Sequence, residues 1–334
     1  MEVLILSQSV IRRVLPVAEC IDVMAEALRA LARGEAHQPL RSVMWLPGNV
    51  AALAAMPAYM TNPHALGVKV ITVFPGNQGT AFDSHQGVVI LFDPEHGHPL
   101  AIADATELTA IRTAAVSGVA TRALARDDAH DLAILGSGTQ ARTHLEAMRV
   151  VRPISRVRVW SRDRAHARRF AERQSNLEGL AVEPAETPRE AVAGADLLCT
   201  VTSAREPVLR GAWVAPGAHI NAVGFSGPAG RELDTRAVVQ SRLFVDRRES
   251  ALHEAGDLAI PITEGAIGPD HIRGELGEVL LGRVPGRTTP EDITAFKSVG
   301  LAIEDVGSLL HVHQRAMERG LGTKVDFGGL REPS

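Results

Sequence analysis

The segment "DLAILGSGTQA", residues 131–141, constrains the possible fold more than any other part of this 334-residue chain. Its apolar run ends at Gly136, and Gly138 and Ala141 complete a G-x-G-x-x-A pattern where helical spacing begins. In a strand–turn–helix unit the first glycine permits the tight turn, and the second lets the backbone approach a pyrophosphate. The free N–H groups of the helix start then face the phosphates. The segment therefore predicts a dinucleotide-binding site, given that further strand–helix units follow it.

The segments that follow the glycine loop continue this alternation. "RVRVWSRDRAHARRFAERQ" repeats strand then helix, "TPREAVAGADLLCTVTS" reads as helix then strand, and "GAHINAVGF" and "SRLFVD" are further apolar runs. Continuous apolar strands that alternate with helices are typical of a doubly wound parallel sheet. We therefore expect an α/β fold with a Rossmann-type NAD(P)-binding domain over residues 117–299.

The rest of the chain has a different pattern. Residues 16–34 and 302–319 have helical spacing, and "TKVDFGG" reads as one last strand. Between residues 41 and 91, short alternating runs are broken by Pro, Gly, Asn and Asp, which predicts antiparallel strands and hairpins. A helix follows, with Thr106 as its expected cap. We expect residues 1–116 and 300–334 to form one α+β domain, on which the C-terminal helix packs.

The composition limits the kinds of partner that the chain is expected to bind. The chain is 45% hydrophobic and 22% charged, its formal net charge is −4, and Lys and Arg are scattered along it. These values predict no nucleic-acid or membrane partner, but a small molecule and a second copy of the chain. Two distant cysteines and an N-terminus unlike a secretory signal favour the cytoplasm. The pairs His96/His98 and His311/His313 are interpreted as surface residues, so no metal site is expected.

The end of the second strand of the predicted sheet bears on the cofactor. NAD enzymes usually carry Asp or Glu there to hold the ribose 2′-hydroxyl, whereas "VRVWSRDR" has Ser161 and Arg162. A hydroxyl and a guanidinium suit a 2′-phosphate, so NADP(H) is preferred. Asp163 lies close enough to keep NAD(H) as the alternative, and Arg162 and Arg164 also fit the solvated start of a helix.

Three cationic residues lie within or beside apolar segments: Lys69 in "GVKVITVF", Arg112 in "LTAIRTAAV" and Arg41 at the start of "RSVMWL". A buried, unpaired cation is costly, so each either keeps its head in water or faces an anion. Together they predict a pocket for a carboxylate, with His85 as a further candidate for its lining. In "INAVGFSGPAGRELD", Ser226 is either a working group or a small residue in a turn.

The residues resemble the ornithine cyclodeaminase/mu-crystallin family, which has ketimine reductases among its members. The resemblance runs nearly end to end and includes "ILGSGTQA", "ELGEVLLGR" and "FKSVGLAIED". Its most specific segments are "RTAA" and "PGAHINAVG", in this order. It implies a Rossmann domain joined to a dimerisation domain, and therefore a homodimer. It also implies that Arg41, Lys69 and Arg112 bind the substrate carboxylate. The positions that match the family's cofactor contacts are Thr113, Gly136, Gly138, Thr139, Gln140, Ser161, Arg162, Thr202, Val223 and Ser298.

This sequence departs from the cyclodeaminases of that family at two positions. They carry an aspartate where Ser226 stands and usually an acidic residue where Ser161 stands, while mu-crystallin and the bacterial imino-acid reductases resemble this chain at both. Cyclodeamination needs several proton transfers, for which a carboxylate is a suitable base. Reduction of a preformed cyclic ketimine needs a bound carboxylate, a placed nicotinamide and excluded water.

The resulting hypothesis is an NADPH-dependent reductase of Δ1-pyrroline-2-carboxylate, and of its six-membered homologue Δ1-piperideine-2-carboxylate, with Lys69 and Ser226 as catalytic candidates. The products would be L-proline and L-pipecolate. The alternatives are an ornithine cyclodeaminase that uses NAD, a related amino-acid dehydrogenase, and a non-catalytic protein that binds NADPH and a ligand.

Overall fold

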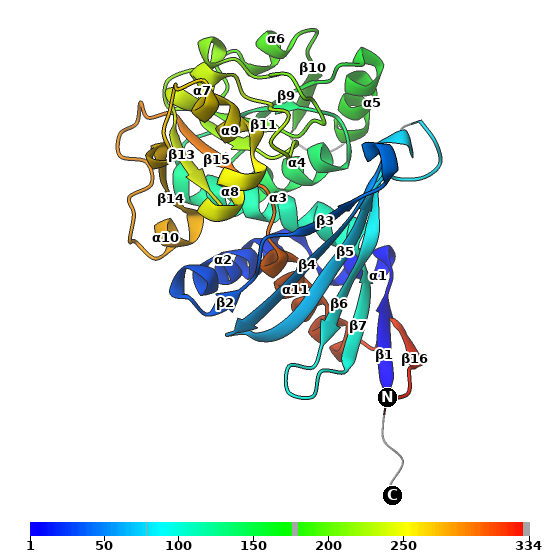
Figure 1. The fold of residues 1–334 in the computed structure, drawn as a ribbon. Coiled ribbons are helices and arrows are strands. Elements are labelled where there is room, and N and C mark those ends of the chain that lie inside the picture. Colours follow the sequence, from blue (N-terminus) through cyan, green and yellow to red (C-terminus); the bar gives the residue numbers. More distant parts are fainter. Residues whose placement is uncertain (78, 176–179, 330–334) are drawn as a thin grey trace, which may run out of the picture. The chain divides into compact units, whose positions relative to one another are not determined.

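The computed structural model describes residues 1–77, 79–175 and 180–329. By their internal contacts these residues divide into two compact units, residues 1–112 with 301 onward and residues 113–300. Each unit contains a β-sheet of its own, and the two sheets differ in strand direction (Figure 1). The expected combination of a parallel Rossmann-type sheet with an α+β unit is confirmed.

The first unit is built on a largely antiparallel sheet, with strand order β16-β1-β7-β6-β5-β4-β2 and with β3 paired to β4. Among the described strands of this sheet, only β1 and β7 form a parallel pair. The strands are β1 (Glu2–Leu6), β2 (Ala36–His37), β3 (Ser42–Trp45), β4 (Ala52–Thr61), β5 (His64–Val73), β6 (His85–Phe92), β7 (Pro99–Asp104) and β16 (Thr323–Asp326).

Helix α11 covers the middle of this sheet, where it contacts β4, β5 and β6 (Figure 1). Gly67 on β5 permits the approach, because a Cβ there would lie 2.9 Å from Cγ2 of Val306 on α11 and 2.7 Å from the carbonyl oxygen of Ile90. The expected return of the C-terminal helix to the first unit is confirmed. The helices of this unit are α1 (Gln8–Val14), α2 (Val17–Arg33) and α11 (Ala302–Glu318), and α3 (Ala105–Leu124) begins in it.

The second unit contains a parallel sheet with strand order β10-β9-β8-β11-β12-β15-β13-β14. The order reverses beside β8, and such a switch point places ligands at the carboxyl ends of the strands. The strands are β8 (Asp131–Leu135), β9 (Arg156–Trp160), β10 (Ala181–Pro184), β11 (Leu197–Thr200), β12 (His219–Ala222), β13 (Arg242–Val245), β14 (Ile272–Glu275) and β15 (Thr294–Lys297).

Small and branched apolar side chains fill the core of the second unit, including Leu135, Ile220 and Val245, each at most 1% exposed. Near-continuous burial along β8, β11 and β12 is typical of parallel strands covered on both faces. The helices are α4 (Thr139–Val151), α5 (Arg164–Gln174), α6 (Pro188–Val192), α7 (Thr235–Val239), α8 (Arg248–Glu254), α9 (Gly256–Thr263) and α10 (Leu276–Leu280).

Candidate functional site

The glycine loop joins the end of β8 to the start of α4. Gly136 has φ +124°, and a Cβ at this position would lie 2.7 Å from the carbonyl oxygen of Val201, so the turn requires glycine. Around Gly138 no described atom lies within 4 Å of the position that a Cβ would take. The glycine at 138 is thus not required by the packing of the protein itself, and the backbone there is open to a ligand.

Helix α4 begins without a side-chain cap. Gly138 is its N-cap, and the N–H groups of Ala141 and Arg142 donate to the Gly138 carbonyl at 3.1 and 3.3 Å. Within the described chain, no backbone hydrogen bond uses the N–H groups of Thr139 and Gln140, and the buried Oε1 of Gln140 has no hydrogen-bond partner. Free N–H groups at the positive end of a 13-residue helix fit a pyrophosphate.

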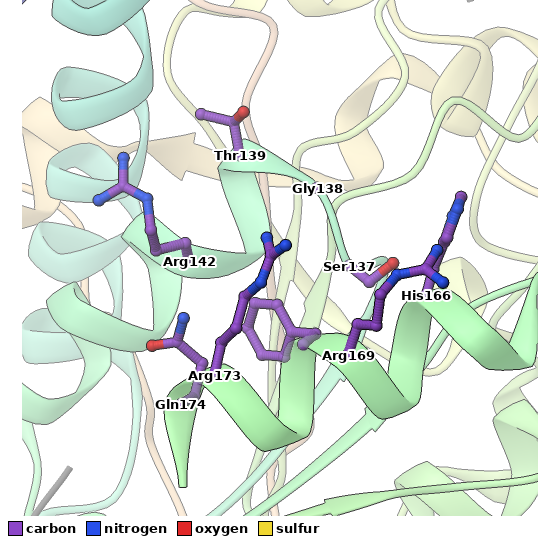
Figure 2. A pocket seen from close by; sticks show the side chains of 9 residues that line it. Ser137, Gly138, Thr139, Arg142, His166, Arg169, Arg173 and Gln174 are labelled. Carbon is purple, nitrogen blue, oxygen red and sulfur yellow. The ribbon is translucent and has the colours of Figure 1, made fainter. Parts of the chain in front are cut away.

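A pocket of about 470 Å³ opens beside this loop (Figure 2). Its lining includes Ser137–Thr139 on one side and His166, Arg169 and Arg173 from α5 on the other. The lining is therefore rich in hydrogen-bond donors and positive charge, and it begins at the loop that faces the expected phosphates.

The end of β9 carries the residues expected to distinguish the two cofactors. Ser161 is half-buried and Arg162 is exposed, with no hydrogen bond or ion pair to the described chain. The Asp163 carboxylate caps α5 by accepting the Ala165 N–H at 2.8 Å. One oxygen of the Asp163 carboxylate is therefore already used to cap this helix.

The other predicted cofactor contacts lie on different elements of the second unit. Thr202, Val223 and Ser298 each follow the carboxyl end of a parallel strand, after β11, β12 and β15. Ser298 is buried, and its hydroxyl donates to Asp246 at 3.3 Å. Thr113 is buried on α3.

Two buried carboxylates and a buried lysine organise the ends of β11, β12 and β15, and sequence reasoning missed all three. Glu232 accepts the N–H groups of Thr202 and Gly224, each at 2.7 Å. Asp257 accepts the Glu232 N–H at 2.9 Å, and its other oxygen lies 2.9 Å from Nζ of Lys297.

The same lysine reaches the segment that carries Ser226. Lys297 Nζ donates to the Phe225 carbonyl at 2.7 Å, while the next residue, Ser226, is exposed and makes no hydrogen bond to the described chain. Burial raises the pKa of Glu232, an effect that the positive charge of Lys297 opposes. In the sequence, Lys297 was the signal that could have revealed this buried network, because it is a cation inside the apolar run "ITAFKSVG".

A buried cluster of opposite charges occupies the first unit. Lys69 takes an inward position on β5, and its Nζ donates to Asp305 Oδ1 at 3.1 Å and to Thr109 Oγ1 at 2.7 Å. Arg112 donates from Nε to the same Asp305 oxygen at 2.9 Å and from Nη1 to Glu304 Oε2 at 2.7 Å. Both carboxylates lie on α11 and are fully buried.

The remaining carboxylate-site candidates lie within electrostatic range of this cluster. Burial lowers the pKa of Lys69 to about 8, and the charges of Arg112 and Arg41 add to this while Asp305 opposes it. Partial burial lowers the pKa of His85, and the charge of Lys69 lowers it further. In the first unit, Arg41 and Arg112 thus interact electrostatically with Lys69, and Lys69 interacts with His85. Sequence reasoning missed the two anions of the cluster, although "AIED" places adjacent acids in an apolar helix.

The paired histidines lie apart from both regions. His96 and His98 occupy the hairpin between β6 and β7, and His311 on α11 lies 3.2 Å from a Glu19 oxygen. Among the described residues, no helix is both long enough and apolar enough to span a bilayer.

Comparisons with known proteins agree with this architecture. The model of the ornithine cyclodeaminase/mu-crystallin family matches residues 1–320. Ketimine reductase mu-crystallin of Mus musculus is 44% identical over 273 residues, which cover 82% of this chain and 83% of the mouse protein.

Two solved structures are similar over nearly the whole chain. Thermococcus litoralis Δ1-pyrroline-2-carboxylate reductase, in complex with NADH and L-proline, has a TM-score of 0.94 and 41% identity, covering 96% of this chain and all of the other. An archaeal alanine dehydrogenase dimer with bound NAD has a TM-score of 0.92 and 34% identity, covering 98% and 100%. The family match over residues 1–320 and these identities show that the chain belongs to the ornithine cyclodeaminase/mu-crystallin family.

Proposed function

We propose that the protein is an NAD(P)H-dependent oxidoreductase that reduces cyclic ketimines, converting Δ1-pyrroline-2-carboxylate to L-proline and Δ1-piperideine-2-carboxylate to L-pipecolate. The observation that carries the proposal is the buried Lys69–Arg112 cluster, in a chain whose other unit carries a glycine loop suited to a dinucleotide. The relatives named for ketimine and Δ1-pyrroline-2-carboxylate reduction support the choice of substrate.

Each candidate side chain has a task in this reaction. Arg112 and Lys69 supply positive charge for the substrate carboxylate, and Arg41 adds a third cation. Glu304 and Asp305 hold the first two in place, so the cluster is organised before substrate arrives. The exposed hydroxyl of Ser226 orients the ring nitrogen without acting as a strong base. The nicotinamide supplies the hydride that the protonated C=N carbon accepts.

For the cofactor we propose a preference for NADP(H), with NAD(H) as the alternative. The unpaired Arg162 guanidinium and the Ser161 hydroxyl suit a 2′-phosphate, and the capping bond of Asp163 supports the same choice. NADH and NAD are bound in the two solved relatives, which supports the alternative.

We further propose a homodimer, in which the first unit binds substrate and supplies the subunit interface. The likeness to a dimeric alanine dehydrogenase supports this, as do the exposed apolar side chains of β3, with Met44 57% and Trp45 62% exposed. A monomer in sedimentation equilibrium would contradict it. We propose a cytoplasmic location, which the free, buried Cys20 and Cys199 support.

The test is a steady-state assay of the purified protein with NADPH or NADH and each cyclic ketimine, followed at the nicotinamide absorbance. We expect imine-dependent oxidation of NADPH with a lower KM than for NADH. The Arg112→Ala variant should lose more than tenfold in kcat/KM, about 1.4 kcal/mol of transition-state binding. If neither cofactor is oxidised with any imine, the reductase proposal is wrong.

The second candidate is an amino-acid dehydrogenase, favoured by the 34% identity to alanine dehydrogenase over nearly the whole chain. Reduction of pyruvate with ammonia, and no turnover of cyclic ketimines, would favour it over imine reduction. Ammonia release from ornithine would instead indicate cyclodeamination. Tight NADPH binding with no turnover of any substrate would indicate the non-catalytic binding protein.

A further inference from the structure

The pocket beside the glycine loop receives two arginines from a single face of α5. Arg169 and Arg173 are four residues apart, which places them one turn from each other on the helix. Figure 2 shows both side chains extending from α5 toward the loop that carries Ser137, Gly138 and Thr139. We name this lining the anion pocket: Ser137, Gly138, Thr139, His166, Arg169 and Arg173.

The neighbouring arginines have carboxylate partners, and these two do not. Arg164 and Arg168 on α5 both pair with Glu186, at 2.7 and 3.3 Å. Arg169 and Arg173 make no hydrogen bond or ion pair anywhere in residues 1–77, 79–175 and 180–329.

Two like charges one turn apart repel each other on a helix surface. A face that carries them toward a pocket, while adjacent arginines are neutralised, is suited to an anion from outside the chain. The anion must also fit beside a loop whose open backbone faces the expected pyrophosphate.

The position of the pocket indicates which anion it would bind. In a doubly wound fold the adenosine ribose extends from the glycine loop toward the end of the second strand, here β9 with Ser161 and Arg162. Helix α5 begins directly after that strand end, at Arg164. A phosphate ester on the ribose 2′-oxygen would therefore lie near this strand end, where α5 begins, and within reach of long side chains on the helix face that lines the pocket. A guanidinium binds such a dianion through two parallel hydrogen bonds.

We propose that Arg169 is a specificity-determining residue that binds the 2′-phosphate of NADP(H), with Arg173 adding positive charge to the same pocket. This inference rests on the proposed preference for NADP(H). It extends that preference from the end of β9 to a second element, the loop-facing side of α5.

The chain offers a matched control. Arg168→Gln removes the same charge from the adjacent position of the same helix, but from the face paired with Glu186. Both arginines are exposed, so neither substitution removes a core contact. A comparison of Arg169→Gln with Arg168→Gln separates local binding from the general effect of one lost charge.

The experiment measures Kd by titration calorimetry for NADPH, NADH, adenosine 2′,5′-bisphosphate and 5′-AMP, with melting temperatures as the check on folding. We expect Arg169→Gln to weaken NADPH and the bisphosphate at least tenfold while NADH and 5′-AMP change less than twofold. Arg168→Gln should change all four less than twofold.

Equal weakening of NADPH and NADH by Arg169→Gln, or no weakening of either, would overturn the inference. The bisphosphate separates this from failure of the proposed function. If the wild-type protein reduces no imine but binds the bisphosphate more tightly than 5′-AMP, and Arg169→Gln abolishes that difference, the reductase proposal fails and the anion pocket stands. If the wild-type protein reduces imines but only Arg162→Gln alters the bisphosphate affinity, the function stands and the pocket inference fails.

Discussion

Lys69 and Arg112 remain charged in the core because two buried carboxylates face them. Asp305 Oδ1 accepts from both cations, and Glu304 Oε2 accepts from Arg112. Removing one partner of a buried ion pair typically costs about 3–5 kcal/mol, because the other charge remains without compensation. Besides compensating these charges, Asp305 affects the pKa of Lys69. Burial lowers that pKa, and the negative charge of Asp305 raises it.

The Asp305→Asn variant tests this effect of one residue on another. In the proposed role Lys69 binds the substrate carboxylate and must be protonated to do so. On that proposal, kcat/KM of the wild-type enzyme should fall as pH rises through the Lys69 pKa of about 8. Without the Asp305 charge the pKa of Lys69 drops further, and the fall should begin at least one pH unit lower, mainly through KM. The measurement is a pH profile of kcat and KM from pH 6 to 10.

Glu304→Gln is the matched control, because it removes a buried charge that contacts Arg112 and not Lys69. We expect a higher KM at every pH and a smaller displacement of the midpoint. Identical midpoints for the wild-type and Asp305→Asn enzymes would show that Lys69 does not control substrate binding.

The element that delivers these carboxylates is α11, and its closeness to β5 depends on a missing side chain. Lys69 and Gly67 share the inward face of β5, and Gly67 faces Val306, the neighbour of Asp305. Helix and strand therefore meet at the point where the ion pair forms. A larger residue at 67 must move either α11 or the backbone of β6.

Gly67→Ala should therefore damage both stability and substrate binding. We expect a loss of about 1–3 kcal/mol in the free energy of unfolding, as overpacking a core typically costs. KM for the imino acid should rise with it, because α11 carries Asp305 away from Lys69, while Kd for NADPH stays unchanged. Gly76→Ala is the control, since no described atom lies within 4 Å of its Cβ position. Equal denaturation curves for the two variants would disprove the contact argument.

At the scale of the whole molecule, the second unit carries two fully buried histidines that stay neutral. His144 Nδ1 donates to the Gln140 carbonyl at 2.7 Å, and burial lowers its pKa to about 4. His219 lies on β12 beside Thr294 and Asn221, and burial lowers its pKa to about 3. In the unfolded chain both titrate near 6.5. The unfolded state therefore binds more protons between these values and pH 6.5, so stability falls as pH falls through this window.

We expect each histidine to cost about 2 kcal/mol of unfolding free energy between pH 7 and pH 5. Urea denaturation at both pH values measures the loss, and the His144→Gln variant isolates one share of it. This variant should be less stable than wild type at pH 7, with a smaller drop toward pH 5. If the variant lost as much stability as the wild type between pH 7 and pH 5, folding would not lower the pKa of His144.

Local patterns were sufficient to predict the elements. The glycine loop, the helix expected at residues 16–34 and the last strand expected in "TKVDFGG" each depend on neighbours in sequence. The structure confirms them, with the helix at Val17–Arg33 and the strand at Thr323–Asp326. One local detail was wrong. Asp104, not Thr106, caps α3 by accepting the Glu107 N–H at 2.8 Å, while the Thr106 hydroxyl donates to the His85 carbonyl.

The sequence by itself determined the glycine loop, whose turn at Gly136 requires glycine, and it predicted which cations among apolar residues are candidates for a carboxylate site. The tertiary structure alone decided their partners. Arg112 meets Asp305 across 193 residues and Lys69 meets it across 236, because α11 returns to β5. Arg169 differs from Arg168 only in the face of α5 that it occupies. Burial and pairing depend on contacts between distant segments, and no spacing along the chain encodes how close two such segments come.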